Sequence, residues 1–150
     1  MDTDYQKLLL YALRLLSKRR YTEHGMYLKL KGRKLGTNED IKQVLSRLKE
    51  LKYINDVSFA EDYIRNRILL NPRGKRMLRL ELKKKGIAQE ILNTAVNNVE
   101  IDEVEIAKLI LKKKERLISK LSDRKRREKI FLLLASRGID IQSIYKVIDR

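Results

Sequence analysis

Apolar residues recur along the chain at the three- and four-residue spacing of amphipathic helices, and no segment alternates convincingly like a β-strand. Long examples cover residues of about 4–17, 57–70 and 102–120. A single proline, Pro72, and six glycines interrupt a chain rich in Leu, Ile, Lys, Arg and Glu. This pattern predicts an all-α protein whose helices are joined by short turns.

A second pattern is an internal repeat of about fifty residues. Residues 28–45, 78–95 and 130–148 align so that Gly36, Gly86 and Gly138 coincide. Each aligned segment reads as a helix, a glycine cap, a short polar turn and another helix. With the helix that precedes it, each segment forms a three-helix unit. The sequence therefore predicts about nine helices in an elongated, curved array of three tandem three-helix repeats, at residues 1–52, 53–99 and 100–150.

Polar residues mark the expected helix starts. In LKYINDVSFAEDYIRNR (51–67), Asn55 suits a turn, and Asp56 is expected to be the N-cap of the helix that follows. The alternative, that this carboxylate and amide perform chemistry, is the less favoured reading. The turn NPRG (71–74) separates two helices of the middle unit. Further N-cap signals are Thr22, Thr37 with Asp40 as a capping box, and Asp123 after a stop at Ser122.

Composition excludes several kinds of site. The chain has 150 residues, no cysteine and one histidine, so disulfides, thiolate metal sites and histidine-based zinc sites are ruled out. It shows no phosphate-binding loop and no G-x-S-x-G motif, and its acid pairs are adjacent, so they diverge on a helix. We expect a protein without catalytic residues, metal or cofactor. Without a signal-peptide pattern or a long apolar segment, it is expected to be soluble and cytoplasmic.

Charge indicates the kind of partner. The net charge is +16, and each third of the chain carries a basic excess, so the excess is not confined to a tail. Such a surface favours a polyanion: nucleic acid, a nucleoprotein or an anionic membrane. A general lysine bias is the simpler alternative. Nucleic acid or a nucleoprotein is the favoured partner.

The basic residues gather in clusters. Residues 71–86 hold seven Lys and Arg against Glu81, and residues 108–129 hold eleven against three acids. Arg76, Arg79 and Lys83 share one helical face. A solvated face is the alternative for each cluster. The candidate binding residues are Lys18, Arg19, Arg20, Arg73, Lys75, Arg76, Arg79, Lys83, Lys84, Lys112, Lys113, Arg124, Lys125, Arg126 and Arg127.

Aromatic residues could stack on bases. Phe59, Tyr63 and Phe131 fall on apolar faces and are expected in the core. Tyr21 follows three basic residues and is the better candidate for exposed stacking, although it fits equally well as a hydrophobic staple before the Thr22 cap. His24 is expected on the surface of a helix or half-buried in one.

The order of these features resembles the RecX family of recombination regulators over nearly the full length. The segments that carry the resemblance are ALRLLSKRRYTE (12–23), YINDVSFAEDYIRNR (53–67), GKRMLRLELKKKGI (74–87) and SRGIDIQSIYKVI (136–148). Family members usually have a Glu-Leu pair where this chain has Gly25 and Met26, and a glycine where it has Lys52.

The resemblance implies a non-enzymatic modulator of the RecA recombinase. Such proteins dock in the groove of the RecA filament on single-stranded DNA, span adjacent protomers, restrain filament growth, and lower ATP hydrolysis and strand exchange. The resemblance implies a role in DNA repair, recombination and the SOS response. We expect a monomer that contacts RecA and DNA but no membrane. The alternatives are a helical-repeat protein that binds nucleic acid without RecA and, more remotely, an enzyme subunit or nuclease accessory.

Overall fold

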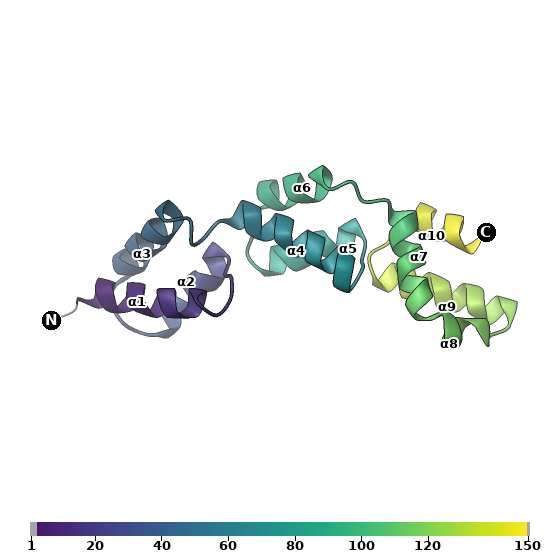
Figure 1. The fold of residues 1–150 in the computed structure, drawn as a ribbon, viewed down its shortest axis with the longest axis horizontal. Coiled ribbons are helices and arrows are strands. Elements are labelled where there is room, and N and C mark those ends of the chain that lie inside the picture. The colour runs from purple at the N-terminus through teal and green to yellow at the C-terminus, as the bar shows by residue number, and fades with distance from the viewer. Residues whose placement is uncertain (1–2, 150) are drawn as a thin grey trace. The chain divides into compact units, whose positions relative to one another are not determined.

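The computed structural model describes residues 3–149 and is helical in that range, without a strand. Within it, ten helices are joined by short connections (Figure 1). They are α1 (Asp4–Leu16), α2 (Glu23–Gly32), α3 (Asn38–Glu50), α4 (Asp56–Leu70), α5 (Lys75–Lys84), α6 (Gln89–Asn98), α7 (Glu103–Lys113), α8 (Glu115–Ser119), α9 (Asp123–Ser136) and α10 (Ile141–Ile148). The predicted all-α class is confirmed. In this described range, no helix is long and apolar enough to cross a bilayer.

The described chain divides into two compact units. The first contains the residues up to Ala60 together with Leu82–Leu92. The second contains Glu61–Glu81 together with the residues from Asn93 onward. Helices α4, α5 and α6 contribute residues to both units. The three-repeat boundaries and the curvature of the array remain predictions.

Helices α1, α2 and α3 enclose the core of the first unit (Figure 1). Leu8 and Ala12 of α1, and Met26 and Leu30 of α2, are four residues apart, so each pair lies on one face of its helix. All four are fully buried. Ile41, Val44, Leu45 and Leu48 of α3 complete this core. The apolar spacing seen in the sequence is therefore used for packing.

The core of the second unit lies among α7, α9 and α10. Its buried side chains are Ile106, Ala107, Ile110, Leu134, Ile139 and Ile144. Phe131 packs against this core while remaining partly exposed, with its ring centroid 5.9 Å from that of Tyr145. Phe59 and Tyr63 are also only half-buried, so none of the three aromatic residues expected in the core is fully buried.

The helix predicted over residues 102–120 is broken at Lys114, which accounts for the tenth helix in the described range. The Lys114 N–H bonds to the carbonyl of Leu111, three residues back, so the last turn of α7 tightens and ends. The short α8 then buries Ile118, whereas Leu117, which would fall on the apolar face of one continuous helix over residues 102–120, is 63% exposed. A uniform helical period extended through the break assigns Leu117 to the wrong face.

Two of the four predicted caps are correct, and two are wrong by one residue. The Thr22 side chain accepts from the Gly25 amide, and Thr37 and Asp40 form the reciprocal capping box. The expectation for Asp56 was wrong by one residue, because the Asn55 side chain accepts from the Ser58 amide and Asp56 begins the helix. Asp123 likewise begins α9, after Ser122. In both cases two neighbouring polar residues are suitable N-caps, and the earlier of the two, Asn55 or Ser122, is the N-cap.

The repeated glycines follow their helices differently. Gly86 and Gly138 each lie two residues beyond a helix end with φ of +80°, as expected for a glycine cap. In the first repeat, α2 ends at Gly32, so the left-handed position falls on Lys34, with φ of +54°. Gly36, with φ of +73°, lies in the turn beyond it. The prediction of a glycine cap is therefore wrong there, because α2 ends two residues early.

Candidate polyanion-binding surfaces

Within the first unit, the start of α2 meets the end of α5, and we call this contact the first junction. The Thr22 hydroxyl donates to the carbonyl of Lys85, 2.8 Å away. The Asp56 carboxylate accepts from the amide of Glu23, the first residue of α2, at 2.9 Å. Gly86 packs so closely on His24 that a Cβ at Gly86 would overlap it. The junction thus fixes the segment around Thr22 beside the residues after α5.

The second unit repeats this arrangement, and we call that contact the second junction. There the amide of Gly74, just before α5, donates to the carbonyl of Arg137, just after α9, at 2.8 Å. The Glu103 carboxylate accepts from the amide of Lys75, the first residue of α5, at 2.8 Å. Gly74 lies 52 positions after Thr22, and Arg137 lies 52 positions after Lys85. The two junctions therefore join matching positions, although the Thr22 hydroxyl donates in the first and the Gly74 backbone amide donates in the second.

The second junction contains a coupled pair of acids. Glu103 also accepts from the backbone amide of Asp140, 2.8 Å away. Burial raises the pKa of Glu103. A hydrogen bond from the Glu103 side chain lowers the pKa of Asp140 to about 2. Asp140 in turn accepts from the Ser143 amide as the N-cap of α10. These carboxylates are occupied in holding helix ends, which is a structural role.

The first junction is hollowed on its surface, with a cavity of about 150 Å³ that we call the basic hollow. Its walls include Arg19, Arg20, Tyr21, Phe59, Lys84 and Lys85. Among the described residues, no carboxylate lines it. Four cations therefore face a small space, of about five water volumes. The arrangement suits an anion.

Aromatic rings position these cations. The Arg19 guanidinium lies 4.5 Å from the ring centroid of Tyr21. The Arg20 guanidinium lies 5.8 Å from the ring centroid of Phe59. The ammonium of Lys85 is 5.9 Å from the Phe59 ring. Arg20 also donates to the Ser58 hydroxyl at 2.6 Å. Stacking of this kind restricts the side chains while leaving charged donors at their ends.

Tyr21 itself is 9% exposed and belongs to the core of the first unit. The prediction that it is exposed for base stacking was wrong. Met26 lies in the same core as Tyr21. A hydrophobic staple pairs the residue before the N-cap, here Tyr21, with the fourth residue of the helix, here Met26, so the staple alternative fits. The apolar ring is buried because it holds the entry of the chain into α2.

The predicted face of the middle helix lies in different surroundings. Lys75, Arg76 and Arg79 line a hollow of the second unit, which we call the mixed-charge hollow. Asp102, Glu103 and Asp140 line it as well, so three acids face three cations. Arg76 donates to the carbonyl of Ala135 at 2.9 Å, and Arg79 to the side chain of Asn97 at 3.1 Å. These arginines have intramolecular partners, which weakens their case as binding residues.

Arg73 is directed inward. It forms an ion pair with Glu81 in which the two side chains are 13% and 17% exposed, and its Nε donates to the carbonyl of Asn71. Tyr63 donates to the other oxygen of Glu81 at 2.8 Å. Burial lowers the pKa of Arg73. The structure thus gives this predicted binding residue a packing role.

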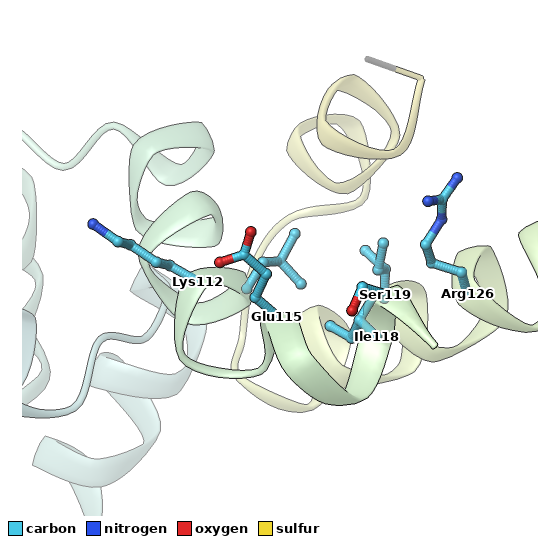
Figure 2. A pocket seen from close by; sticks show the side chains of 7 residues that line it. Lys112, Glu115, Ile118, Ser119 and Arg126 are labelled. Atoms are coloured by element: carbon cyan, nitrogen blue, oxygen red, sulfur yellow. The ribbon is translucent and has the colours of Figure 1, made fainter. Parts of the chain in front are cut away.

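The cations of the third cluster are spread over α7 and α9. Lys112 and Arg126 line a hollow of about 480 Å³ but lie apart, with Glu115 and Ser119 between them (Figure 2). Several cations of this cluster have partners: Lys113 reaches the carbonyl of Leu70, Arg124 pairs with Glu128, Arg126 with Asp123 and Arg127 with Asp149. Lys125 is exposed, as are Lys18, Lys83 and Lys84 of the other clusters. This surface is basic but not concentrated at one point.

The structure adds three residues to the predicted set at the basic hollow: His24, Phe59 and Lys85. Lys85 belongs to the basic run before Gly86, so composition already signalled it. Phe59 and His24 carry no such signal, because their place depends on contacts between segments distant in sequence. Of the predicted residues, Arg19, Arg20 and Lys84 are brought together there.

Comparison with known proteins agrees with this architecture. A family model described as the second three-helix domain of RecX matches residues 55–96. The regulatory protein RecX of Chlorobium phaeobacteroides (strain BS1) is 34% identical, across 99% of this chain and 96% of that protein. The regulatory protein RecX of Prosthecochloris aestuarii is also 34% identical, across 99% of this chain and 95% of that protein.

Solved structures give the same result. The crystal structure of RecX from Lactobacillus salivarius matches with a TM-score of 0.85 and 27% identity, covering 97% of this chain and 95% of that one. A crystal structure of regulatory protein RecX, 24% identical and with a TM-score of 0.84, shares the fold across 98% of this chain and 72% of that one. Because the similarity to the RecX proteins of Chlorobium phaeobacteroides and Prosthecochloris aestuarii extends over nearly the whole of this chain and of theirs, this protein belongs to the RecX family of regulatory proteins.

Proposed function

We propose that this protein binds the RecA filament on single-stranded DNA and restrains its extension, ATP hydrolysis and strand exchange. Membership of the RecX family supports a regulatory role. The observation that carries the proposal further is the basic hollow, which concentrates four cations on a chain of net charge +16. A nucleoprotein filament presents many phosphates, so such a surface is attracted to it.

The proposed regulator acts without catalysis and as a monomer. Its acids serve the fold: Asp56 and Glu103 hold helix starts, and Glu81 pairs with Arg73. Modulation then arises from occupancy of the filament, which lowers the rate of steps that need the filament to grow or rearrange. The regulator thus acts through its binding energy to the filament and not through a chemical reaction.

The test is the single-stranded-DNA-dependent ATPase of RecA, measured with increasing substoichiometric amounts of this protein. We expect inhibition below one protein per RecA protomer, because one regulator that blocks extension affects many protomers. An unrelated basic protein of similar size, at equal concentration, controls for sequestration of DNA by charge alone. Full ATPase activity, together with no co-sedimentation with filaments, would refute the proposal.

The alternative function is nucleic-acid binding independent of RecA, and the basic hollow favours it equally as a source of affinity. The two are separated by binding to bare single-stranded DNA. Under the alternative, binding is retained and steeply salt-dependent while the ATPase is unaffected. Under the main proposal, the ATPase responds at concentrations where bare DNA is not saturated.

A further inference from the structure

We propose that an apolar groove between α9 and α10, the α9–α10 groove, is a docking site for an acidic amphipathic segment of another protein. The groove is lined by Arg127, Glu128, Phe131, Leu132, Tyr145 and Ile148. Its volume is about 390 Å³, and it lies wholly within the second unit. The inference rests on the proposed function, because it names the part of this chain that contacts the protein of the filament rather than the DNA.

The groove presents apolar side chains to solvent. Leu132 of α9 is 66% exposed, and Tyr145 of α10 is exposed as well. Ile141, which is also exposed, lies four residues before Tyr145 and so extends the same face of α10. The ring centroid of Phe131 lies 5.9 Å from that of Tyr145, so two aromatic rings adjoin in the groove. Such a surface is suited to burial against the apolar face of a partner helix.

Comparison with the preceding helix pair shows that the fold does not need apolar side chains at these positions. Helices α6 and α10 begin 52 positions apart, and their buried residues Leu92 and Ile144 match at the same spacing. The positions 52 residues before Phe131, Ile141 and Tyr145 are polar, namely Arg79, Gln89 and Asn93. The core position is thus apolar in both pairs, whereas these groove positions are polar in the earlier pair. The apolar groove therefore indicates a role other than packing within the chain.

Charge beside the groove favours an acidic partner. Residues 123–129, the first two turns of α9, hold five Lys and Arg against two acids. Lys125 and Lys129 are exposed and lie seven and three residues before Leu132, so they continue its face toward the start of α9. The N-terminal end of a helix also favours negative charge, so the cations and the helix dipole act in the same direction. A segment with acids beside its apolar residues complements both the groove and this flank.

Two further cations beside the groove have acidic partners within the chain. Arg127 pairs with Asp149 at 3.0 Å, and Arg124 pairs with Glu128 at 3.5 Å. All four side chains are more than half exposed. Exposed pairs contribute little to stability, so exchanging these partners for acids of a docked segment costs little.

Two other occupants fit the groove less well. A second copy of this chain would bring a further net charge of +16 against the same basic flank. A single strand of DNA suits the cations, but its charged backbone gains nothing from the aliphatic side chains of Leu132 and Ile148. A protein segment that carries both apolar and acidic residues is the occupant that satisfies both features.

The first experiment places the photo-reactive residue p-benzoylphenylalanine at position 145 and irradiates the protein on RecA filaments formed on oligothymidylate. We expect cross-links to RecA, and peptide mapping should find them in a segment that contains apolar and acidic residues. The same photo-reactive residue at position 117, exposed in α8, is the control and should give a lower yield. Cross-links mainly to DNA or to a second copy, or equal yields at the two positions, would overturn the inference.

The second experiment compares two double variants in filament binding. Leu132→Ser with Tyr145→Ser removes exposed apolar side chains from the groove, and Leu109→Ser with Leu117→Ser removes them elsewhere in the same unit. For the groove variant we expect affinity for the filament to fall about tenfold or more. Its salt slope and its affinity for bare oligothymidylate should stay unchanged, because no charge is removed. Equal losses of filament affinity in the two variants count against the groove.

Thermal unfolding checks that both double variants fold. Leu132→Ser alone leaves the Phe131 and Tyr145 rings in place and provides the milder variant. It should lower filament affinity in the same direction as the double variant. Wild-type affinity in a folded Leu132→Ser protein, together with no cross-link to RecA from position 145, would exclude docking in the groove.

The third experiment tests the acidic character of the partner. Lys125→Glu with Lys129→Glu reverses two charges beside the groove, and Lys7→Glu with Lys29→Glu reverses two exposed charges in the first unit. Both variants have the same net charge, so general attraction to the filament falls equally in both. We expect the first variant to lose several-fold more filament affinity and cross-linking from position 145 than the second. Equal losses would contradict an acidic partner.

The groove and the proposed function fail separately. Absence of filament binding, with full RecA ATPase activity, defeats both. Inhibition that survives Leu132→Ser with Tyr145→Ser, together with no cross-link to RecA from position 145, defeats the groove alone. Cross-links to RecA from position 145 without inhibition of the ATPase support the groove and defeat the proposed restraint of the filament.

Discussion

The carboxylate of Asp56 accepts a hydrogen bond from the backbone amide of Glu23, 33 positions earlier and 2.9 Å away. Asp56 is the first residue of α4, yet the helix whose free amide it satisfies is α2. Glu103, the first residue of α7, does the same for Lys75 at the start of α5. One acid at the start of a helix thus stabilises the start of another in each unit.

This relationship predicts different effects for two substitutions at Asp56. Asp56→Ala removes the acceptor and should lower the free energy of unfolding by about 1 to 2 kcal/mol. Asp56→Asn keeps an oxygen acceptor and removes a half-buried charge, so it should stay close to the wild type. Urea unfolding of the three proteins measures this. Equal losses in the two variants would show that the charge, not the hydrogen bond, matters.

A pH dependence follows from the same residue. Burial raises the pKa of Asp56 above its ordinary value of 3.8, so the folded protein binds this proton more tightly than the unfolded chain. Its contribution to stability is then fully present below 3.8 and is lost as pH rises through the folded pKa. Lowering the pH through this range should favour the wild type over Asp56→Asn. A difference in unfolding free energy that does not vary with pH would contradict this.

The close backbone approach at the second junction predicts a loss from adding a single carbon atom. A Cβ at Gly74 would overlap the carbonyl of Gly138, which is backbone and cannot rotate away. Gly74→Ala should therefore destabilise the protein by about 2 kcal/mol or more. Gly32→Ala is the matched control, since no atom lies within 4 Å of its Cβ, and it should stabilise α2 by up to about 1 kcal/mol. Thermal unfolding distinguishes the two.

Lys52 occupies a left-handed conformation, with φ of +62°, just after the cap of α3. Glycine adopts this conformation without the penalty that a Cβ brings, so Lys52→Gly should raise stability by about 0.5 to 1 kcal/mol. The same replacement at Lys42, exposed within α3, should lower it by about 1 kcal/mol. Opposite signs for the two lysines are the expected outcome of chemical unfolding. A loss at both positions would refute the argument.

The ion pair of Arg73 and Glu81 should contribute more than a surface pair. Glu81→Gln leaves a largely buried guanidinium without its counter-charge, which should destabilise the protein by about 2 to 3 kcal/mol. Glu128, which is 62% exposed in its pair with Arg124, provides the control, and Glu128→Gln should change stability by less than about 0.5 kcal/mol. Equal effects in calorimetry would contradict the packing role assigned to Arg73.

Most of the helices were predictable because their apolar positions repeat at helical spacing over ten residues or more. The failures have local causes. Asn55 and Asp56 both fit a cap, and only the folded chain shows that the carboxylate serves α2. The end of α7 at Lys114 depends on a tightened last turn that leaves no mark in the apolar pattern.

The candidate site was predictable only in part. Charge indicated Arg19, Arg20 and Lys84, but not that they meet, because their proximity depends on the contact of Thr22 with Lys85. From the sequence alone, Arg73 and Arg76 are equally good candidates for binding residues. Their acceptors, Glu81 and the Ala135 carbonyl, lie on segments whose proximity no local pattern reveals.

The contact of Thr22 with Lys85 also bears on how the chain is made. The two residues are 63 positions apart, so the first three helices are synthesised well before their partner at the end of α5. Until Lys85 leaves the ribosome, the Thr22 hydroxyl has no acceptor there and the basic hollow does not exist. At ordinary rates of translation the interval is about several seconds, long compared with the formation of helices. The nascent protein therefore completes the basic hollow only after its second group of helices has emerged.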